Sequence, residues 1–543
     1  MGENLLMENK NAERVLGQPD QHTYYNAVQL SLPVNTLISL EKDDPVFAFL
    51  EAVESIDFSR YVRPITSNNT RSHDRGMLVK VLLFGYMNGV ESVNELSRLC
   101  RTDLRYLYLS NEERPSAMAF SRVCDQLTAS IDSLFFDLSG EITALLDIDT
   151  STQFVDGTKI EANAQKNTFV YRKRIVNARD RLSLRITESI KSLDHAYGYC
   201  YPVKDIYCAQ EIGYIAQYLM EVMTGNNIEL HYGKGHRKSK FQEYYDSFLK
   251  YALKLDEYEY WLSEMGERNS CSKTDHDATF MATKWDYYNQ SGVTRPCYNC
   301  QIAVADGIIV NSEVYQTPSD AVTWIPFMDR WNRYTGTYPE KPVADAGYGG
   351  YDNYLYNIRK GIELVQKFPM YGKEHDKKFT SRKYLPQNWK TSEDGYRVCP
   401  KGRVFDQRGA DRETVTRCGN TVIQQIFTEG RHCAKCGMKK ECLKKSNRCG
   451  FKTITKNVIR EELESKVREN LSTEEGIRLK TERSEQVEGA FGVMKQDMKF
   501  TRFHRKNLKN VRMEFILNCL GYDLLKYYRR WLSMHHNQTE YRS

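Results

Sequence analysis

The chain has 543 residues and a formal net charge of +6. This length predicts several domains with a large core. No stretch approaches the roughly twenty uninterrupted apolar residues that a membrane span needs, and the start of the chain lacks the basic residues and apolar run of a signal peptide. These features exclude a membrane-spanning chain, and we expect a protein of the cytoplasm with no membrane partner.

Positive charge is concentrated in one region. Residues 359–460 contain 25 Lys or Arg and 10 Asp or Glu, so the rest of the chain is net negative. An excess of this kind favours a polyanionic partner, above all nucleic acid, although a solvated basic surface would look the same.

The first part of the chain is helical by pattern. Residues 1–42 show little periodicity and read as an N-terminal arm. From residue 43 to 148, apolar residues recur at helical spacing in four segments that begin near Pro45, Gly76, Ser92 and Pro115. Arginines outside the apolar faces suit a DNA-binding domain, and equally a helical bundle of another function.

The stretch 153–161 predicts a strand with an acid in its middle. Alternation places Phe154 and Asp156 on one face and Val155 on the other. A charge inside a sheet is costly unless it is paired or binds a cation. Asp156 is therefore a candidate metal ligand, unless Asp156-Gly157 merely forms a tight turn.

Long helical periodicity in residues 167–284 predicts a helical insertion. Strands return at Cys300–Ala305 and Ile308–Val314, and Asp306-Gly307 between them predicts a hairpin turn. A helix over 320–335, a strand ending at Asp345, a helix over 351–359 and a strand at 362–365 follow.

Without the insertion, this element order predicts an α/β fold with a ribonuclease H-like mixed sheet, formed by residues 149–166 and 285–370. In that fold the first strand carries an acid, the fourth ends in another, and a late helix brings a third. Residues 484–498 supply such a helix, with Val487, Ala490, Phe491 and Met494 as its apolar stripe. We prefer Glu488 as the third acid, with Glu485 as the alternative.

Three converging carboxylates form a hard, oxygen-rich site for two divalent ions, Mg²⁺ or Mn²⁺. Such a pair of ions activates a hydroxyl and stabilises the leaving oxygen during displacement at phosphorus. We expect Lys495, and Arg483 one turn or so before Glu488, to contact DNA phosphates. A surface role for Lys495 is the alternative.

Three blocks together resemble DDE transposases of bacterial insertion sequences: Asp156-Gly157-Thr158-Lys159, Ala344–Tyr348 and Val487–Lys495. The likeness is closest to a subgroup with a helical N-terminal domain and a cysteine-bearing insertion, and it runs from about residue 43 to 530. Asp275–Ala278 and Tyr298–Gln301 also resemble that subgroup.

The resemblance implies that Asp156, Asp345 and Glu488 bind the metal ions. It also implies that the protein cuts and rejoins DNA at the ends of its own element, in the nucleoid and as a homo-oligomer. Many relatives carry a Tyr and an Arg before the Glu. Here Thr481 and Ser484 stand near those positions, so the role of Arg483 stays open.

A basic insertion at residues 371–480 contains six cysteines. The two-residue gap between Cys433 and Cys436 lets both thiolates reach one zinc ion. Cys399 and Cys442 would complete a four-sulfur site, the pattern expected of the subgroup, with Cys418 and Cys449 as alternates. Unligated reduced cysteines are the competing interpretation. For the similarly spaced Cys297 and Cys300 we expect core packing.

The last region, residues 481–543, joins the catalytic helix to a C-terminal helical segment. Residues 499–506 alternate basic and aromatic side chains, and we expect Arg502, Arg505 and Lys506 to bind DNA, with the aromatic rings free to stack on an unpaired base. We expect His504 to contact phosphate or to lie on the surface.

The sequence thus predicts a DDE transposase. A ribonuclease H-like nuclease that cleaves without joining is one alternative. A non-catalytic, zinc-dependent DNA-binding repressor derived from such an enzyme is another.

Overall fold

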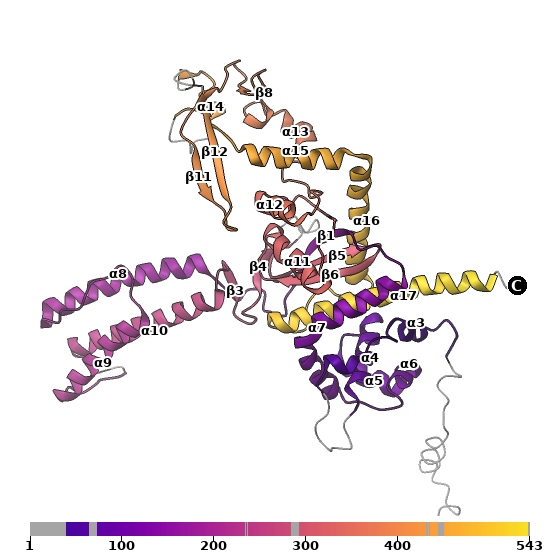
Figure 1. The fold of residues 1–543 in the computed structure, drawn as a ribbon. Helices are drawn as coiled ribbons and strands as arrows, with labels where there is room; N and C mark the ends of the chain where they lie inside the picture. The colour runs from indigo at the N-terminus through magenta and orange to yellow at the C-terminus, as the bar shows by residue number, and fades with distance from the viewer. Residues whose placement is uncertain are drawn as a thin grey trace, which may run out of the picture.

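The computed structural model describes residues 40–63, 73–233, 235, 237–283, 293–429, 433, 435–443 and 450–540. A central sheet carries a helical domain on one side, a long helical arm, and an elongated insertion that points away from both (Figure 1). Most of the predicted N-terminal arm and Cys449 lie outside the described residues.

The N-terminal domain is helical, as its periodicity predicts. Asp44 begins the first helix, because its side chain accepts a hydrogen bond from the Val46 amide and Pro45 occupies the first turn. Two short helices that the pattern did not reveal, η2 and α6, complete the domain. Its elements are α3 (Pro45–Ala52), η2 (Phe58–Tyr61), α4 (Arg75–Met87), α5 (Val93–Thr102), α6 (Leu104–Leu109) and α7 (Ala117–Leu145).

The central sheet is mixed. β1 (Thr152–Glu161) pairs antiparallel with β5 (Thr294–Ala305) and parallel with β7 (Lys341–Ala344). The other edge of β5 pairs with β4 (Thr279–Ala282) and with β6 (Ile308–Tyr315). The predicted hairpin is confirmed, and both turn residues have positive φ, 42° at Asp306 and 78° at Gly307.

The strand predicted at residues 362–365 is wrong. Ile362, Leu364 and Val365 are buried, so the apolar run is real. Only one parallel bridge forms beside it, between Ala344 and Gln366, and the Glu363 amide donates to the Glu340 carbonyl, so the segment runs along β7 without forming a continuous ladder.

Helices cover both faces of the sheet. α16 (Glu474–Gln496) and α17 (Leu508–Glu540) pack on the face that carries Asp156 and Thr158. α11 (Asp320–Thr335) lies on the opposite face, where Asp320 meets Lys159, and α12 (Tyr351–Lys360) packs against α11. The two layers bury Cys297 and Cys300 completely, which confirms their expected packing role.

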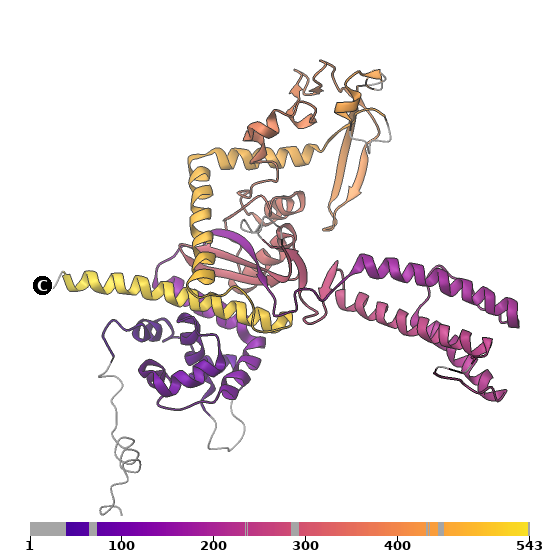
Figure 2. The same ribbon diagram turned by 180° about the vertical axis from the view of Figure 1, so that it is seen from behind.

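The predicted helical insertion forms an arm with a core of its own (Figures 1 and 2). A two-stranded neck joins it to the body, since β2 (Phe169–Tyr171) pairs with β3 (Ser270–Ser272). The arm consists of α8 (Arg172–Tyr197), α9 (Ala209–Gly225) and α10 (Lys240–Met265).

The basic insertion between α12 and α16 consists of short elements followed by one longer helix. Its main feature is a ribbon in which β12 pairs with β10, β11 and β13. Its elements are η3 (Lys373–His375), α13 (Lys377–Thr380), η4 (Pro386–Asn388), β8 (Lys390–Thr391), β9 (Arg397–Val398), β10 (Gln407–Arg408), β11 (Arg412–Val415), β12 (Thr421–Thr428), α14 (Lys439–Cys442), β13 (Ile454–Lys456) and α15 (Val458–Ser472). None of the helices in the described ranges is long and apolar enough to cross a bilayer.

Candidate active site

Two of the three predicted acids lie on adjacent parallel strands, Asp156 in the middle of β1 and Asp345 directly after the end of β7. Val155 of β1 is the register partner of Ala344 of β7. Asp156 follows Val155 and Asp345 follows Ala344, so the parallel pairing sets the two acids next to each other. The backbone holds each carboxylate, because the Gly157 amide donates to Asp156 Oδ1 at 2.8 Å and the Gly347 amide donates to Asp345 Oδ1 at 2.7 Å.

A buried arginine faces the first acid. Arg483 Nη1 on α16 lies 3.2 Å from Asp156 Oδ2, and the Arg483 side chain is only 10% exposed. Burial raises the pKa of Asp156, the Arg483 charge opposes that rise, and the neighbouring Asp345 adds to it. Asp156 is therefore a desolvated carboxylate that depends on a nearby cation.

The third predicted acid is on the expected helix, but it does not form a close cluster with the other two. α16 packs against β1, β5 and β7, while Glu488 and its alternative Glu485 are both exposed. The carboxylate oxygens of Asp156, Asp345 and Glu488 do not all lie within 4.8 Å of one another. The structure thus brings together two acids and the helix of the third.

Other cations surround this pair of acids. Lys495 Nζ donates to the Thr158 hydroxyl, two residues after Asp156 on the same face of β1. Burial lowers the pKa of Lys367, and the Arg483 and Lys480 charges lower it further, whereas Asp345 acts against them. Lys367 and Lys480 carried no motif in the sequence, and only the fold places them here.

A buried polar network supports the acids from the other face of the sheet. The Gln301 amide donates to Asn299 at 2.9 Å and to Asp320 at 3.1 Å, and Tyr348 donates its hydroxyl to Gln301. Asp320 also receives Lys159 Nζ at 3.2 Å. This network joins the strand of Asp156 to the loop of Asp345, because Tyr348 follows Asp345 by three positions.

Gly157 is required by this network. A Cβ at Gly157 would lie 2.1 Å from Gln301 Nε2. The glycine after Asp156 therefore allows close approach of a side chain and does not form the tight turn considered from the sequence.

The C-terminal basic and aromatic segment is placed differently from its prediction. Phe500 and Phe503 are each 1% exposed and pack on one another, so they are not free to stack on a base. Arg502 donates to the carbonyls of Ala162 and Ala164, and Lys506 is exposed. Arg505 is partly buried, and its charge lowers the pKa of the buried Cys124 against the larger effect of burial.

His504 lies on the surface, as one of its two predicted roles requires. Its imidazole Nδ1 is 2.9 Å from Glu91 and 3.3 Å from Glu514. Within the described ranges, these three residues are the only group of three or more His, Cys, Asp or Glu whose ligand atoms all lie within 4.8 Å. The group joins the N-terminal domain to the start of α17.

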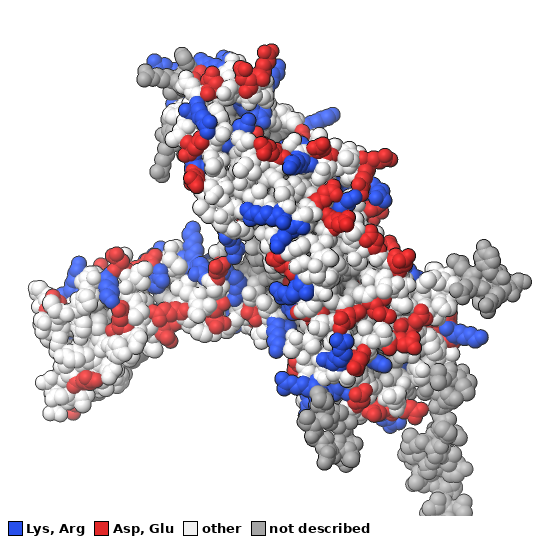
Figure 3. Space-filling model, in the orientation of Figure 1, with Lys and Arg blue, Asp and Glu red and all other residues white. Residues whose placement is uncertain are grey.

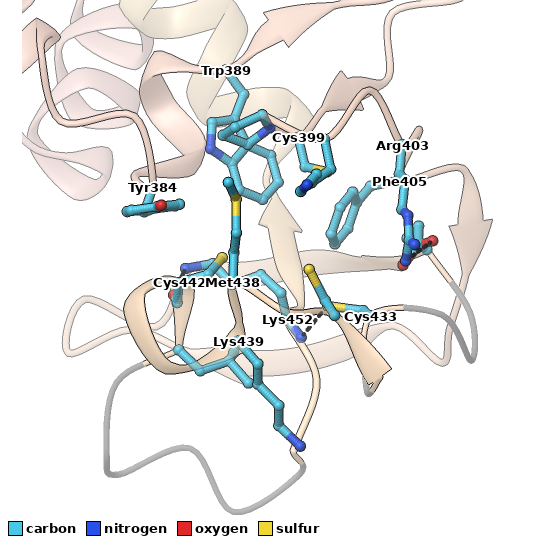
Figure 4. A pocket seen from close by; sticks show the side chains of 15 residues that line it. Tyr384, Trp389, Cys399, Arg403, Phe405, Cys433, Met438, Lys439, Cys442 and Lys452 are labelled. Atoms are coloured by element: carbon cyan, nitrogen blue, oxygen red, sulfur yellow. Dashed lines mark hydrogen bonds and ion pairs between the residues drawn. The ribbon is translucent and has the colours of Figure 1, made fainter.

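Four of the clustered cysteines line one small cavity in the insertion: Cys399, Cys433, Cys436 and Cys442 (Figure 4). Trp389 and Phe405 form an apolar wall, with ring centroids 5.1 Å apart. Burial raises the pKa of Cys442, and the other three thiols add to that rise. No three of the described sulfur atoms lie within 4.8 Å of one another. Cys418 is exposed and outside the cavity.

Two families match the chain. One, described as "Transposase DDE domain", matches residues 398–528, and the other, described as "Transposase domain (DUF772)", matches residues 35–126. The chain belongs to the DDE transposases. The first match covers the cysteines and α16, whereas Asp156 and Asp345 of this transposase lie outside it. No curated protein and no solved structure matches the chain.

Proposed function

We propose that this transposase cuts and rejoins DNA at the ends of its own insertion sequence, by phosphoryl transfer at Asp156, Asp345 and Glu488. The observation that carries the proposal is the parallel pairing of β1 with β7, which sets two acids next to each other beside the helix of the third. We further propose that the core is ribonuclease H-like. Three antiparallel strands, a parallel fourth strand and helices on both faces support that assignment.

The donor set suits Mg²⁺ or Mn²⁺. Asp156 and Asp345 offer hard oxygen ligands, and Asp156 already attracts a guanidinium. Two bound ions would activate the attacking hydroxyl and stabilise the leaving oxygen. Glu488 would complete the ligand set when its exposed side chain turns toward β1.

We propose that Arg483 and Lys495, which lie near the acids, bind the phosphates of the DNA substrate. When Asp156 has another counter-charge, Arg483 is released and can pair with a DNA phosphate. Lys495, held above Thr158, lies on the same face of β1 and would position the adjacent phosphate. Both side chains would hold the scissile strand over the acids without taking part in proton transfer.

The insertion supports a zinc proposal. The thiols of Cys399, Cys433, Cys436 and Cys442 line one cavity, and zinc would draw them, as thiolates, into a tetrahedral site and fix the loops that carry them. We also propose that residues 43–148 bind DNA, and that the active complex is a homo-oligomer working at the nucleoid.

A strand-transfer assay with a pre-nicked donor tests the proposal. The donor carries the DNA that flanks the gene of this chain, where the inverted repeats of an insertion sequence are expected. We expect joined products from the wild type, and none from Asp156→Asn, Asp345→Asn or Glu488→Gln. Glu485→Gln, one turn before Glu488 on the same helix and equally exposed, is the matched control and should remain active.

The assay also separates the alternatives. Cleavage without joining would identify a nuclease. If the three acid variants bind end DNA and leave mobility unchanged, a non-catalytic repressor is the better description.

A further inference from the structure

The arm has an uneven distribution of charge. Residues 172–185, the half of α8 next to the neck, contain six Lys or Arg and one Asp. Residues 194–232, which follow toward the far part of the arm, contain one Lys and five Asp or Glu. Residues 233–240, from the loop after α9 to the first residue of α10, contain four Lys or Arg and no Asp or Glu, so residues 194–240 as a whole carry no net charge. The excess of positive charge on the arm is therefore concentrated on the half of α8 next to the neck.

Three of these cations form a stripe on α8. Arg174, Arg181 and Arg185 are exposed and stand at i, i+7 and i+11, which places them on one side of the helix. The buried residues Ile175 and Leu182 define a different side. We call the three arginines the α8 ridge.

The α8 ridge has few partners of its own. Within the described ranges, Arg181 and Arg185 form no ion pair, and Arg174 lies over the Tyr171 ring at 5.2 Å. Exposed arginines without carboxylate partners are available to bind an external anion.

The α8 edge of the arm faces the basic insertion. In both ribbon views α8 is the arm helix nearest to the β11–β12 hairpin (Figures 1 and 2). The hairpin meets the base of the arm, where Arg417 lies 2.9 Å from Glu267. Lys and Arg side chains gather along this edge of the arm and at its base (Figure 3). The arm and the insertion thus diverge from a corner with basic side chains on both sides.

We propose that the α8 ridge binds the phosphate backbone of duplex DNA lying between the arm and the insertion. Phosphates are the anions that a row of exposed arginines recognises without any pocket. Residues 194–240, farther from the body, contain as many Lys and Arg as Asp and Glu, so no comparable excess of positive charge continues beyond the ridge. This inference rests on the proposed action on DNA, and the DNA is either the end of the element or its target.

Duplex binding at several salt concentrations tests the inference on the full chain. The ridge variant carries Arg174→Gln, Arg181→Gln and Arg185→Gln. The control carries Lys191→Gln, Lys240→Gln and Lys250→Gln, which remove the same charge from three exposed positions of the arm outside the ridge. The probes are a duplex of arbitrary sequence and a duplex of the flanking terminal repeat.

Each lost phosphate contact lowers the slope of log K against log salt by about 0.9. We expect the ridge variant to lose about two to three such contacts, with at least a tenfold loss of affinity, and the control to keep the wild-type slope. An equal loss of affinity for both probes would show that the ridge binds any duplex, as target capture requires. A larger loss of affinity for the terminal repeat would show that the ridge binds the end of the element.

Two results would overturn the inference. If the two triple variants weaken binding equally, only the overall charge matters. If the ridge variant binds as the wild type does, DNA lies elsewhere and the proposed transposase activity still stands. If the wild type bound no duplex DNA, that result would contradict the proposed function as well.

Discussion

Arg483 of α16 lies 3.2 Å from Asp156 of β1, so the helix that carries the third acid is tied to the first acid through a cation. The ion pair explains how a largely buried carboxylate is tolerated in the sheet. It also places the guanidinium where a divalent ion is expected to bind.

Replacing Arg483 with Gln should therefore destabilise the metal-free protein. Asp156 would keep its burial and lose its counter-charge, at a cost of about 1–3 kcal/mol. Added Mn²⁺ should raise the melting temperature of the variant more than that of the wild type, because the ion no longer competes with Arg483. Calorimetry with and without Mn²⁺ measures both effects.

Arg478→Gln is the control, because Arg478 is 65% exposed on the same helix. Its melting temperature should match the wild type in both conditions. Equal Mn²⁺ shifts in the Arg483 variant and the wild type would show that the ion does not bind at Asp156.

Gly157→Ala tests the network beneath the acids. The new methyl group would meet Gln301 at 2.1 Å, and such overpacking costs about 1–3 kcal/mol. Gln301→Ala removes the obstacle but leaves the Tyr348 hydroxyl without its acceptor. Denaturant unfolding of both single variants and the double variant should show that the double variant loses less than the sum.

Gly140→Ala provides the comparison for that experiment. Gly140 is inside α7 and a Cβ there meets nothing within 4 Å, so this change should stabilise by about 0.5–1 kcal/mol. Additive losses at Gly157 and Gln301 would contradict the predicted clash.

The sequence pattern correctly predicted the features that depend only on residues close together in the chain. Alternation around Asp156, the Asp306-Gly307 turn and the long periodicity of α8 to α10 each depend on neighbours in sequence, and the structure agrees with them. Burial set by distant elements was not predictable. Phe503 packs against Tyr298 of β5, and no feature of residues 499–506 indicates that contact.

The same distinction applies to the candidate site. Asp156 interrupts the apolar alternation of one strand and Asp345 directly follows another, so the sequence alone indicates both acids. Lys367, Lys480 and Gln301 join the site only because α16, β5 and the segment that follows α12 meet there. The failed strand at residues 362–365 has a related cause, since an apolar run predicts burial but does not determine whether a continuous ladder forms with the neighbouring β7.

The junction of Glu91, His504 and Glu514 should make stability depend on pH. Burial and the Glu514 charge raise the pKa of Glu91 to about 7, and the hydrogen bond to Glu514 raises the pKa of His504. Both groups bind protons more tightly when folded. Their stabilisation is therefore complete at low pH and is lost as pH rises through their folded pKa values.

We expect the free energy of unfolding contributed by this junction to fall by about 1–3 kcal/mol between pH 5 and 8, measured by denaturant unfolding. Most of the effect should come from Glu91, because the His504 side chain is 74% exposed and solvent screens its ion pairs. Glu91→Gln should flatten the profile. Glu54→Gln, at an exposed position of the same domain, should keep it, and a profile unchanged by Glu91→Gln would refute the assignment.

Zinc content tests the cysteine cavity. The purified protein should contain about one zinc ion per chain, the content of a single four-thiolate site. Cys433→Ser should lose it, because three thiolates and a hydroxyl hold zinc more weakly. Loss of zinc should also make the insertion sensitive to limited proteolysis, since Trp389 and Phe405 form only a small apolar wall around the cavity.

Cys418→Ser is the matched control, because Cys418 is an exposed cysteine of the same insertion outside the cavity. It should retain both the metal and the protease resistance. A chelator should reproduce the Cys433 phenotype in the wild type and have no further effect on the Cys433 variant. Metal-free wild-type protein with a protease-resistant insertion would show that the four thiols simply pack against the aromatic wall.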